Sequence, residues 1–210
     1  MTNTDIKVTI LGNSSVGKTS LTRRIVYDHF EVDTTSTIGA AFCSFNRIHK
    51  NQSYNFKMWD TAGQERFKTM VPMYLRGSQI VIMVFDLCNR DSFSDLINFW
   101  YYEVKKTQPD ANMILIGSKL DLINSDENKR EIRYIQAKNA SEVRNMKYIE
   151  CSAKDGNNVD KIIDLMLETA EKIYEEKKEI TPEDIFKLYE TEETWKDKLN
   201  SLLGNGCYFL

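Results

Sequence analysis

A short glycine-framed segment near the N-terminus has the spacing of a phosphate-binding loop. Residues 12–19 are Gly-Asn-Ser-Ser-Val-Gly-Lys-Thr, which fits the pattern Gly-x4-Gly-Lys-Ser/Thr. Glycines allow the backbone to curve so closely that successive N–H groups point at phosphate oxygens. Lys18 then places a positive charge near the β and γ phosphates, and the Thr19 hydroxyl is a ligand for Mg²⁺. The segment predicts a nucleoside triphosphate site without choosing between ATP and GTP; a glycine-rich turn with a structural role is the alternative.

The elements around this loop fit a fold that binds phosphate at a strand-to-helix turn. Apolar runs at residues 6–11, 80–85, 113–116 and 148–151 are typical of buried parallel strands. Apolar residues three or four apart predict helices over 18–27, 92–106, 132–145 and 159–176. Residues 41–48 and 54–59 alternate around the turn-like segment 50–53, which predicts an antiparallel hairpin. We therefore expect an α/β doubly wound sheet, mostly parallel and six-stranded, with one antiparallel strand and flanking helices.

Length and charge set the class of protein. A chain of 210 residues with 41% hydrophobic side chains fits one domain with an appendage, which we place at residues 5–178 and 179–210. The net charge of −3 gives no reason to expect nucleic-acid binding. No signal peptide and no apolar run of the roughly 20 residues that span a bilayer is present. The cysteines lack the paired spacings of zinc sites and disulfide frameworks, which favours reduced thiols in cytosol: Cys43, Cys88, Cys151 and Cys207.

A second motif lies at the end of the expected hairpin, where residues 59–65 are Trp-Asp-Thr-Ala-Gly-Gln-Glu. Over about residues 5–178 the chain resembles the small Ras-like GTPases, and this segment resembles their switch II. The resemblance implies that Gly63 contacts the γ-phosphate through its amide and that Gln64 orients the attacking water. Catalysis would thus involve Gln64, Lys18 and Thr37; Mg²⁺ would be held by Thr19, Thr37 and Asp60; and the phosphates would contact Ser15, Val16, Gly17, Lys18, Thr19 and Ser20. Thr37, as the switch I threonine, would engage metal and γ-phosphate only in the GTP state.

Two later segments would choose the base: residues 118–121, Ser-Lys-Leu-Asp, and residues 152–154, Ser-Ala-Lys. Asp121 can accept both the N1 and N2 hydrogens of guanine, which adenine does not supply. A buried carboxylate left unpaired costs on the order of several kcal/mol, so Asp121 favours GTP over ATP. The resemblance further places the stems of Lys119 and Lys154 on the two faces of the base, the Ala153 amide at its O6 and the ring of Phe30 against the guanine; Phe30 as a core or helix-end residue is the alternative.

One position departs from the family pattern. The family normally has asparagine where this chain has Ser118, and an amide reaches further than a hydroxyl. We expect weaker nucleotide binding and faster spontaneous release, by roughly 1 kcal/mol or a little more for a lost or lengthened hydrogen bond. Guanine selectivity should persist because Asp121 is retained.

Two stretches indicate a branch of the family. Residues 36–42 and 64–67 resemble Rab GTPases and, more narrowly, the early-endosomal Rab subgroup. This implies an effector-binding surface of Phe42, Trp59 and Tyr74, and a protein that regulates vesicle traffic on the cytoplasmic face of endosomal or vesicle membranes, with a cytosolic pool. Without the family, Phe42 and Trp59 would be sheet residues packing against neighbours.

The resemblance also implies partners. No arginine in the chain must act in cis on the phosphates, so intrinsic GTP hydrolysis should be slow and should need an activating protein. An exchange factor, a prenyl-chain escort and effectors complete the expected partners of a monomeric protein. The rival readings are a GTP-binding scaffold with little hydrolysis, a Ras-type signalling GTPase, and a P-loop ATPase or kinase, against which Asp121 argues.

The C-terminal segment carries a lipidation pattern. Cys207-Tyr208-Phe209-Leu210 has the C-a-a-X form, with the terminal leucine that favours geranylgeranylation of Cys207. Most Rab proteins end in two cysteines, so the responsible prenyl transferase is open. One lipid chain holds a membrane weakly, and over residues 175–200 nine acidic residues outnumber five lysines, a net charge of −4, so no polybasic signal assists it. Apolar residues after Pro182 recur at near-helical spacing, so this segment could form an amphipathic helix on lipid or a partner. In solution a flexible acidic linker is favoured, because short isolated helices are marginal.

Overall fold

A computed structural model describes residues 3–32, 37–63 and 70–179, with side chains described as far as Glu176. Residue contacts divide the chain between Glu171 and Lys172 into two units. The account below concerns the first unit, which contains every described element except the end of the last helix. Gln64, Cys207 and the tail that the sequence analysis singled out lie outside the described residues.

The described part of the chain forms one six-stranded sheet in the order β2-β3-β1-β4-β5-β6. Only the β2–β3 pair is antiparallel, and the pairs β1–β3, β1–β4, β4–β5 and β5–β6 are parallel. The predicted fold class is therefore confirmed. The strands are β1 (Asn3–Leu11), β2 (Ala40–His49), β3 (Gln52–Thr61), β4 (Ile80–Asp86), β5 (Asn112–Ser118) and β6 (Lys147–Glu150).

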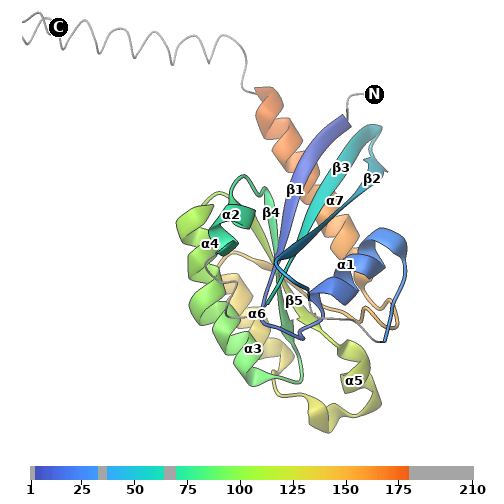
Figure 1. The fold of residues 1–210 in the computed structure, drawn as a ribbon, viewed down its shortest axis with the longest axis vertical. Coiled ribbons are helices and arrows are strands. Elements are labelled where there is room, and N and C mark those ends of the chain that lie inside the picture. Colours follow the sequence, from blue (N-terminus) through green and yellow to red (C-terminus); the bar gives the residue numbers. More distant parts are fainter. Residues whose placement is uncertain (1–2, 33–36, 64–69, 180–210) are drawn as a thin grey trace, which may run out of the picture. The chain divides into compact units, whose positions relative to one another are not determined.

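Helices lie on both sides of this sheet (Figure 1). The long ones start close to their predicted positions: α1 (Lys18–Tyr27), α6 (Tyr134–Val143) and α7 (Val159–Glu179). The helix predicted over 92–106 is a continuous helical rod whose middle widens into a π-helical turn: α3 (Arg90–Asp95), η2 (Leu96–Trp100) and α4 (Tyr101–Thr107). Three short segments have no counterpart in the sequence analysis: α2 (Val71–Leu75), α5 (Leu120–Ser125) and the 3₁₀ turn η3 (Glu127–Lys129).

The alternation of β4 explains how the two faces are filled. Val81, Met83 and Phe85 belong to one buried cluster with residues of α2, α3, η2, α4 and α6, at whose centre Trp100 is fully buried. The intervening Ile80, Ile82 and Val84 are also fully buried, because β4 is covered on both faces. No helix in the described ranges is long and apolar enough to cross a membrane.

The β2–β3 hairpin turns more tightly than the sequence suggested. Its ladder runs as far as His49 opposite Gln52, so the turn itself consists of Lys50 and Asn51. Both have positive φ, 46° and 66°, as a two-residue hairpin turn requires. The predicted four-residue turn 50–53 thus counted two residues that belong to β3.

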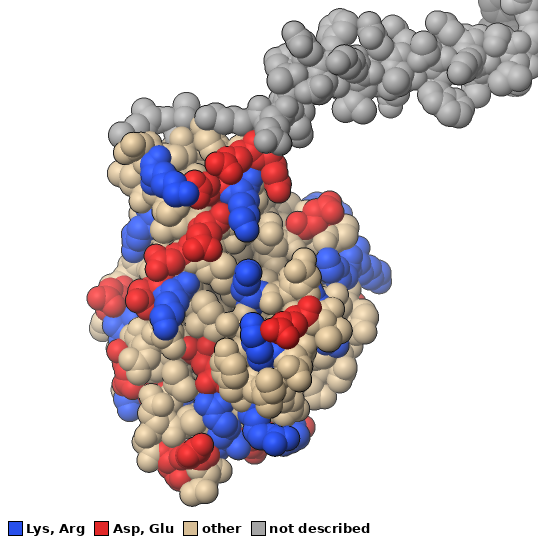
Figure 2. Space-filling model, turned by 180° about the vertical axis from the view of Figure 1, so that it is seen from behind, with Lys and Arg blue, Asp and Glu red and all other residues tan. Residues whose placement is uncertain are grey.

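The face seen in Figure 2 carries Lys and Arg side chains interleaved with Asp and Glu. No single sign of charge dominates this face, in keeping with a net charge of −3 for the whole chain.

Candidate functional site

The candidate site lies where the parallel strands end. β1 ends at Leu11 before the glycine-framed loop, β3 at Thr61 before Gly63, and β5 at Ser118 before Lys119. Because carboxyl ends of parallel strands meet at one edge of a sheet, segments far apart in the sequence converge there.

The loop between β1 and α1 has the close approach that its glycines predict. A Cβ at Gly12, whose φ is 143°, would overlap the carbonyl of Val84. Gly17 has φ 91° and caps α1, which begins at Lys18. The N-terminus of this helix therefore faces the loop's concavity, which suits the binding of a phosphate anion.

Lys18 is folded back into this loop. Its Nζ donates to the carbonyl oxygens of Gly12 at 2.9 Å and Asn13 at 2.7 Å. Burial lowers the pKa of Lys18 to about 8, and the neighbouring Asp60 carboxylate opposes that shift. A phosphate at this position would supply the negative charge that the buried ammonium lacks.

The three predicted Mg²⁺ ligands lie together. The Thr19 hydroxyl donates to Asp60 Oδ2 at 2.6 Å and lies 2.9 Å from the Thr37 hydroxyl. Asp60 Oδ1 is buried and has no hydrogen-bond partner within the described part of the protein. Burial raises the pKa of Asp60, with the Thr19 hydrogen bond and Lys18 acting in the opposite direction.

This donor set fits a small hard cation. A carboxylate with an unused buried oxygen beside two hydroxyls offers the oxygen ligands that Mg²⁺ prefers, while leaving positions for phosphate oxygens and water. Elsewhere in the described residues no group of three or more His, Cys, Asp or Glu side chains gathers to hold a metal. The residues present therefore fit Mg²⁺ at this position.

Gly63 lies directly against the phosphate-binding loop. A Cβ at this position would overlap the carbonyl group of Asn13 and the Nζ of Lys18. Only glycine fits here without moving the loop. Its predicted role at the γ-phosphate is compatible with this position.

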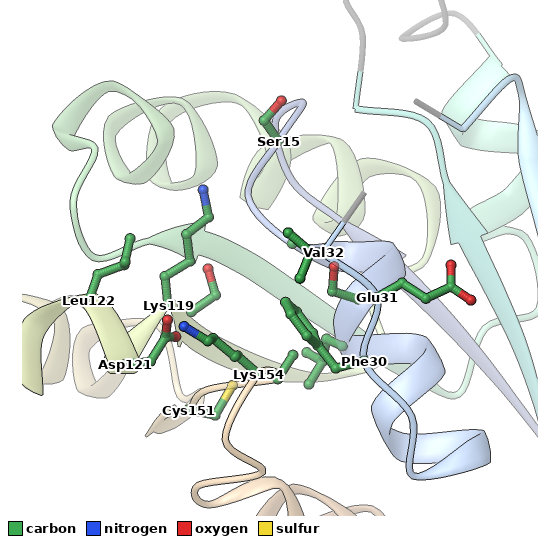
Figure 3. Close-up of a pocket in the computed structure, with 14 residues that line it drawn as sticks. Ser15, Phe30, Glu31, Val32, Lys119, Asp121, Leu122, Cys151 and Lys154 are labelled. Carbon is green, nitrogen blue, oxygen red and sulfur yellow. The ribbon is translucent and has the colours of Figure 1, made fainter. Parts of the chain in front are cut away.

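A cavity of about 400 Å³ adjoins the phosphate-binding loop. Lys119, Asp121, Leu122 and Lys154 lie on one side of it and Phe30 and Val32 on the other, with Ser15 at one end (Figure 3). The predicted site residues that line it are Ser15, Gly17, Ser20, Phe30, Ser118, Lys119, Asp121, Ala153 and Lys154. The sequence analysis did not assign to the site five further lining residues: Leu21, Glu31, Val32, Leu122 and Cys151. An exposed apolar residue beside a polar loop, such as Val32, gives no signal that distinguishes it from an ordinary surface position.

The two segments predicted to choose the base are joined to each other. Ser152 Oγ donates to Asp121 Oδ1 at 2.8 Å and accepts from the Asp155 N–H at 3.1 Å. The Leu120 N–H donates to the Cys151 carbonyl at 3.0 Å. Ser152, predicted as a nucleotide contact, is fully buried and orients the Asp121 carboxylate from behind.

Ser118 connects the base segment to the phosphate-binding loop. Its hydroxyl lies 2.6 Å from the Val16 carbonyl oxygen and 2.8 Å from that of Phe85, and the side chain is buried. One hydroxyl proton cannot serve both acceptors at once. The serine hydroxyl therefore lies within hydrogen-bond distance of both carbonyl oxygens. It has one donor hydrogen, whereas the amide of an asparagine has two.

Lys119 has a partner that the sequence did not reveal. Its Nζ lies 2.7 Å from Asp86 Oδ2, at the end of β4. Asp86 lies opposite Ser118 in the β4–β5 ladder, 33 positions before Lys119 in the sequence, so no local pattern links the two residues. The pair holds the lysine stem along the mouth of the cavity that Lys119 lines.

Asn13 is a second residue that the sequence analysis passed over. Its amide donates to Asp95 Oδ2 at 2.6 Å and accepts from the Trp100 indole N–H at 2.9 Å. Through this side chain the phosphate-binding loop is attached to the end of α3 and to the π-helical turn. A variable position inside a loop motif carries no signal for such a contact.

The aromatic surface predicted for effectors is continuous. The rings of Phe42 and Trp59 lie 5.2 Å apart and those of Trp59 and Tyr74 6.0 Å apart. Phe42 and Trp59 are also directly paired across the hairpin, so they pack against each other as sheet neighbours too. Three apolar side chains close to these residues in the sequence are also exposed: Ile38, Met70 and Met73.

The chain resembles known proteins over most of its length. The model of the Ras family matches residues 7–172. The chain is 41% identical to the GTP-binding protein YPT53 of Saccharomyces cerevisiae over 157 residues, which is 73% of this chain and 71% of that protein. It is 39% identical to the Ras-related protein Rab-5A of Dictyostelium discoideum over 80% of each chain. It is 37% identical to the human Ras-related protein Rab-22A over 75% of this chain and 79% of that one.

Proposed function

This chain belongs to the Rab proteins of the Ras family of small GTPases, and we propose that it regulates vesicle traffic at endosomal membranes by recruiting effectors in its GTP state. As a Rab GTPase it binds GTP and GDP, hydrolyses GTP, and works with regulators and effectors. The names of its relatives Rab-5A and Rab-22A support the early-endosomal assignment.

The observation that carries guanine binding is the position of Asp121. This carboxylate lines the cavity, is held by Ser152, and lies between the Lys119 and Lys154 side chains. Such an arrangement can accept two hydrogens from the edge of a guanine whose faces are covered by the lysine stems and by Phe30. An adenine in the same place would offer this carboxylate neither of the two hydrogens.

At the other end of the cavity, the residues of the loop and α1 start would bind the phosphates. The N–H groups from Ser15 to Ser20 and the Lys18 ammonium would neutralise their charge, and Gly63 would meet the γ-phosphate. Thr19, Thr37 and Asp60 would hold Mg²⁺, whose positive charge would offset the negative charge of the phosphates.

Hydrolysis then requires the protein only to position groups and stabilise charge. Lys18 would stabilise charge on the transferred phosphoryl group, Thr37 would close over it, and Gln64 would orient the attacking water. We propose that an activating protein supplies a catalytic arginine, because no arginine of this chain is assigned to the phosphates. We further propose that an exchange factor opens the site to release GDP.

Membrane attachment would come from a prenyl group on Cys207. We propose a GTP-binding domain at residues 5–178 and a tail at 179–210 that carries this group, which an escort protein would shield in the cytosol. Whether the tail after Pro182 adds an amphipathic helix is tested by proteolysis of residues 181–206 with and without liposomes. Equal cleavage in both excludes a lipid-bound helix.

The enzymatic part of this proposal is tested with Gln64→Leu. Single-turnover hydrolysis of bound GTP should slow by at least about tenfold in the variant, because the water loses its orienting group. A wild-type rate no faster than that of the variant would favour a GTP-occupied scaffold.

The cellular part is tested by affinity capture on the Gln64→Leu protein loaded with GTP, with the GDP-loaded wild type as control. Capture of endosomal tethering or sorting proteins by the GTP form alone supports the assignment. The triple change of Phe42, Trp59 and Tyr74 to alanine should abolish capture; binding that survives it would move the effector surface elsewhere.

A further inference from the structure

Arg24 joins α1 to the loop that precedes α7, although 129 and 130 positions separate it from its partners. Its Nε donates to the Ala153 carbonyl at 2.7 Å, and its Nη2 donates to the Lys154 carbonyl at 2.9 Å. Ala153 and Lys154 both line the cavity assigned above to the guanine base. A residue on the first helix therefore fixes the backbone of the last base-recognition segment.

The guanidinium is itself fixed by the end of its own helix. Nη1 donates to the Asp28 carbonyl at 2.9 Å and lies 3.0 Å from Asp28 Oδ1. Asp28 has φ 50° and returns its own N–H to the Arg24 carbonyl, so the helix ends in a closed loop around this side chain. All three nitrogens of the fork are engaged, which a lysine could not reproduce.

From Arg24 a chain of hydrogen bonds continues to the base-reading carboxylate. A trans peptide unit points its C=O and the following N–H in opposite directions. The Lys154 carbonyl faces Arg24, and the Asp155 N–H of the same unit donates to Ser152 Oγ at 3.1 Å. Ser152 Oγ in turn donates to Asp121 Oδ1 at 2.8 Å.

We infer that Arg24 is a positioning residue for guanine recognition: it fixes the Ala153–Lys154 backbone and, through Ser152, the Asp121 carboxylate. The inference rests on the proposed guanine site. Arg24 is not among the residues that line the cavity, so it would act by setting the orientation of groups that line it. Without the Arg24 side chain, the Ala153–Lys154 backbone is expected to move away from the cavity while the phosphate-binding loop stays in place.

The surroundings of Arg24 make this testable by truncation. Its side chain is 17% exposed and borders a second cavity of about 530 Å³ between α1, β2 and the start of α7. Removing the guanidinium widens an existing space rather than emptying the core. Arg47 borders the same cavity, donates to the carbonyl of its neighbour Asn46 and lies 4.9 Å from the centroid of the Phe45 ring. Arg47→Ala therefore removes the same charge without touching residues 153–154.

The experiment measures release of bound GDP and of inosine diphosphate from wild type, Arg24→Ala, Arg24→Lys and Arg47→Ala. Hypoxanthine, the base of inosine, lacks the N2 amino group from which Asp121 would accept a hydrogen bond. In the wild type we expect inosine diphosphate to leave much faster than GDP. In Arg24→Ala we expect GDP release to accelerate about tenfold, which corresponds to one weakened charge-assisted hydrogen bond. The release rate of inosine diphosphate divided by that of GDP should become smaller.

A second readout separates positioning from general loosening. Chelation of Mg²⁺ with EDTA accelerates release through the phosphate end, and this acceleration factor should be the same in wild type and Arg24→Ala. Arg24→Lys should show a smaller change in the same direction, and it provides the answer if the alanine variant does not fold. Arg47→Ala should behave as wild type.

Each result decides a distinct point. Unchanged GDP release in the Arg24 variants, or faster release with the inosine ratio unchanged, overturns the inference and leaves Arg24 a structural tether. A wild-type protein that releases inosine diphosphate no faster than GDP would instead overturn the guanine site itself.

Discussion

Ser118 joins the segment after β5 to the phosphate-binding loop through a single hydroxyl group. Its hydroxyl borders the carbonyls of Val16 and Phe85, one in the phosphate-binding loop and one in β4, yet it has one proton to give. The amide of asparagine would have two donors for the same two carbonyls and an acceptor left over. The structure thus supplies a reason for the weaker binding that the sequence predicted.

We predict that Ser118→Asn slows GDP release. The gain of one hydrogen bond is worth about 1 kcal/mol, or roughly fivefold in the dissociation rate of a fluorescent GDP analogue. Ser118→Ala is the opposing control and should speed release, because both carbonyls then lose their only side-chain donor at this position. Equal GDP release rates in Ser118→Asn and wild type would show that the second donor of an asparagine adds nothing to nucleotide binding.

Cys151 lines the base cavity but is fully buried, and burial raises the pKa of its thiol from 9.0 to about 12. At pH 8 its thiolate fraction is then about 10⁻⁴ instead of about one tenth, so alkylation should be slow. We predict that iodoacetamide labels the half-buried Cys88 before Cys151 in a Cys207→Ser background, as mass spectrometry of digests would report.

The direction of the pH effect follows from the same shift. Between about pH 9 and 12 an unfolded Cys151 loses its proton while the folded one keeps it, so this residue contributes less stability as pH rises through that window. Unfolding exposes the Cys151 thiol and returns its pKa toward the ordinary value, so labelling of Cys151 should increase in step with unfolding by urea. Rapid labelling of the native protein at pH 8 would mean that the cavity opens to solvent more readily than its geometry implies.

At the scale of elements, the π-helical turn η2 is attached to the phosphate-binding loop by one amide. Asn13 accepts from the Trp100 indole and donates to Asp95, on the helical rod that runs from α3 to α4. π-helical turns are rare and are often found beside functional sites. This contact couples the loop that would bind phosphate to the helix that follows β4.

We predict that Asn13→Ala lowers the free energy of unfolding by about 1–3 kcal/mol, since it removes two hydrogen bonds, one of them to a carboxylate. Urea titration followed by tryptophan fluorescence measures the change. Asn98→Ala is the matched control: it removes an asparagine from η2 whose amide bonds only the exposed Ser94, and it should shift the midpoint little. Similar losses in the two variants would remove the special role of Asn13.

The elements that the sequence predicted are the long ones with a strong period. Strands β1, β4 and β5 and helices α1 and α7 begin within a few residues of their predicted positions. Helix α2, with five residues, and α5, with six, are too short to show an apolar period, so they were missed. The hairpin turn shifted because positive φ at Lys50 and Asn51 is a property of the folded ladder.

The site divides in the same way. Residues in contiguous motifs, such as Lys18, Asp60 and Asp121, could be predicted as site residues because their spacing is local. Asn13, Arg24 and Asp86 were not found, because each acts through a contact between elements distant in the sequence. Such contacts depend on sheet order, which brings the ends of β1, β4 and β5 side by side.

At the scale of the whole molecule, the nucleotide would connect segments that otherwise touch only at their edges. The base would contact the ends of β5 and β6, the phosphates the loop after β1, and Mg²⁺ the end of β3. A ligand that binds only the folded state stabilises it in proportion to the logarithm of its concentration over Kd. Stability should therefore report occupancy of the entire site.

We predict that GDP with Mg²⁺, added to nucleotide-free protein at about 100 times its Kd, raises the free energy of unfolding by about 2.7 kcal/mol. For a domain of this size that corresponds to a rise of about 5–11 °C in Tm, measured by scanning calorimetry. GDP with EDTA should give a smaller rise, because Asp60 Oδ1 then keeps no partner. ADP with Mg²⁺ should give almost none, because it meets the phosphate-binding loop but offers Asp121 neither of guanine's two hydrogens. Equal rises with ADP and GDP would show that the phosphate end alone stabilises the fold.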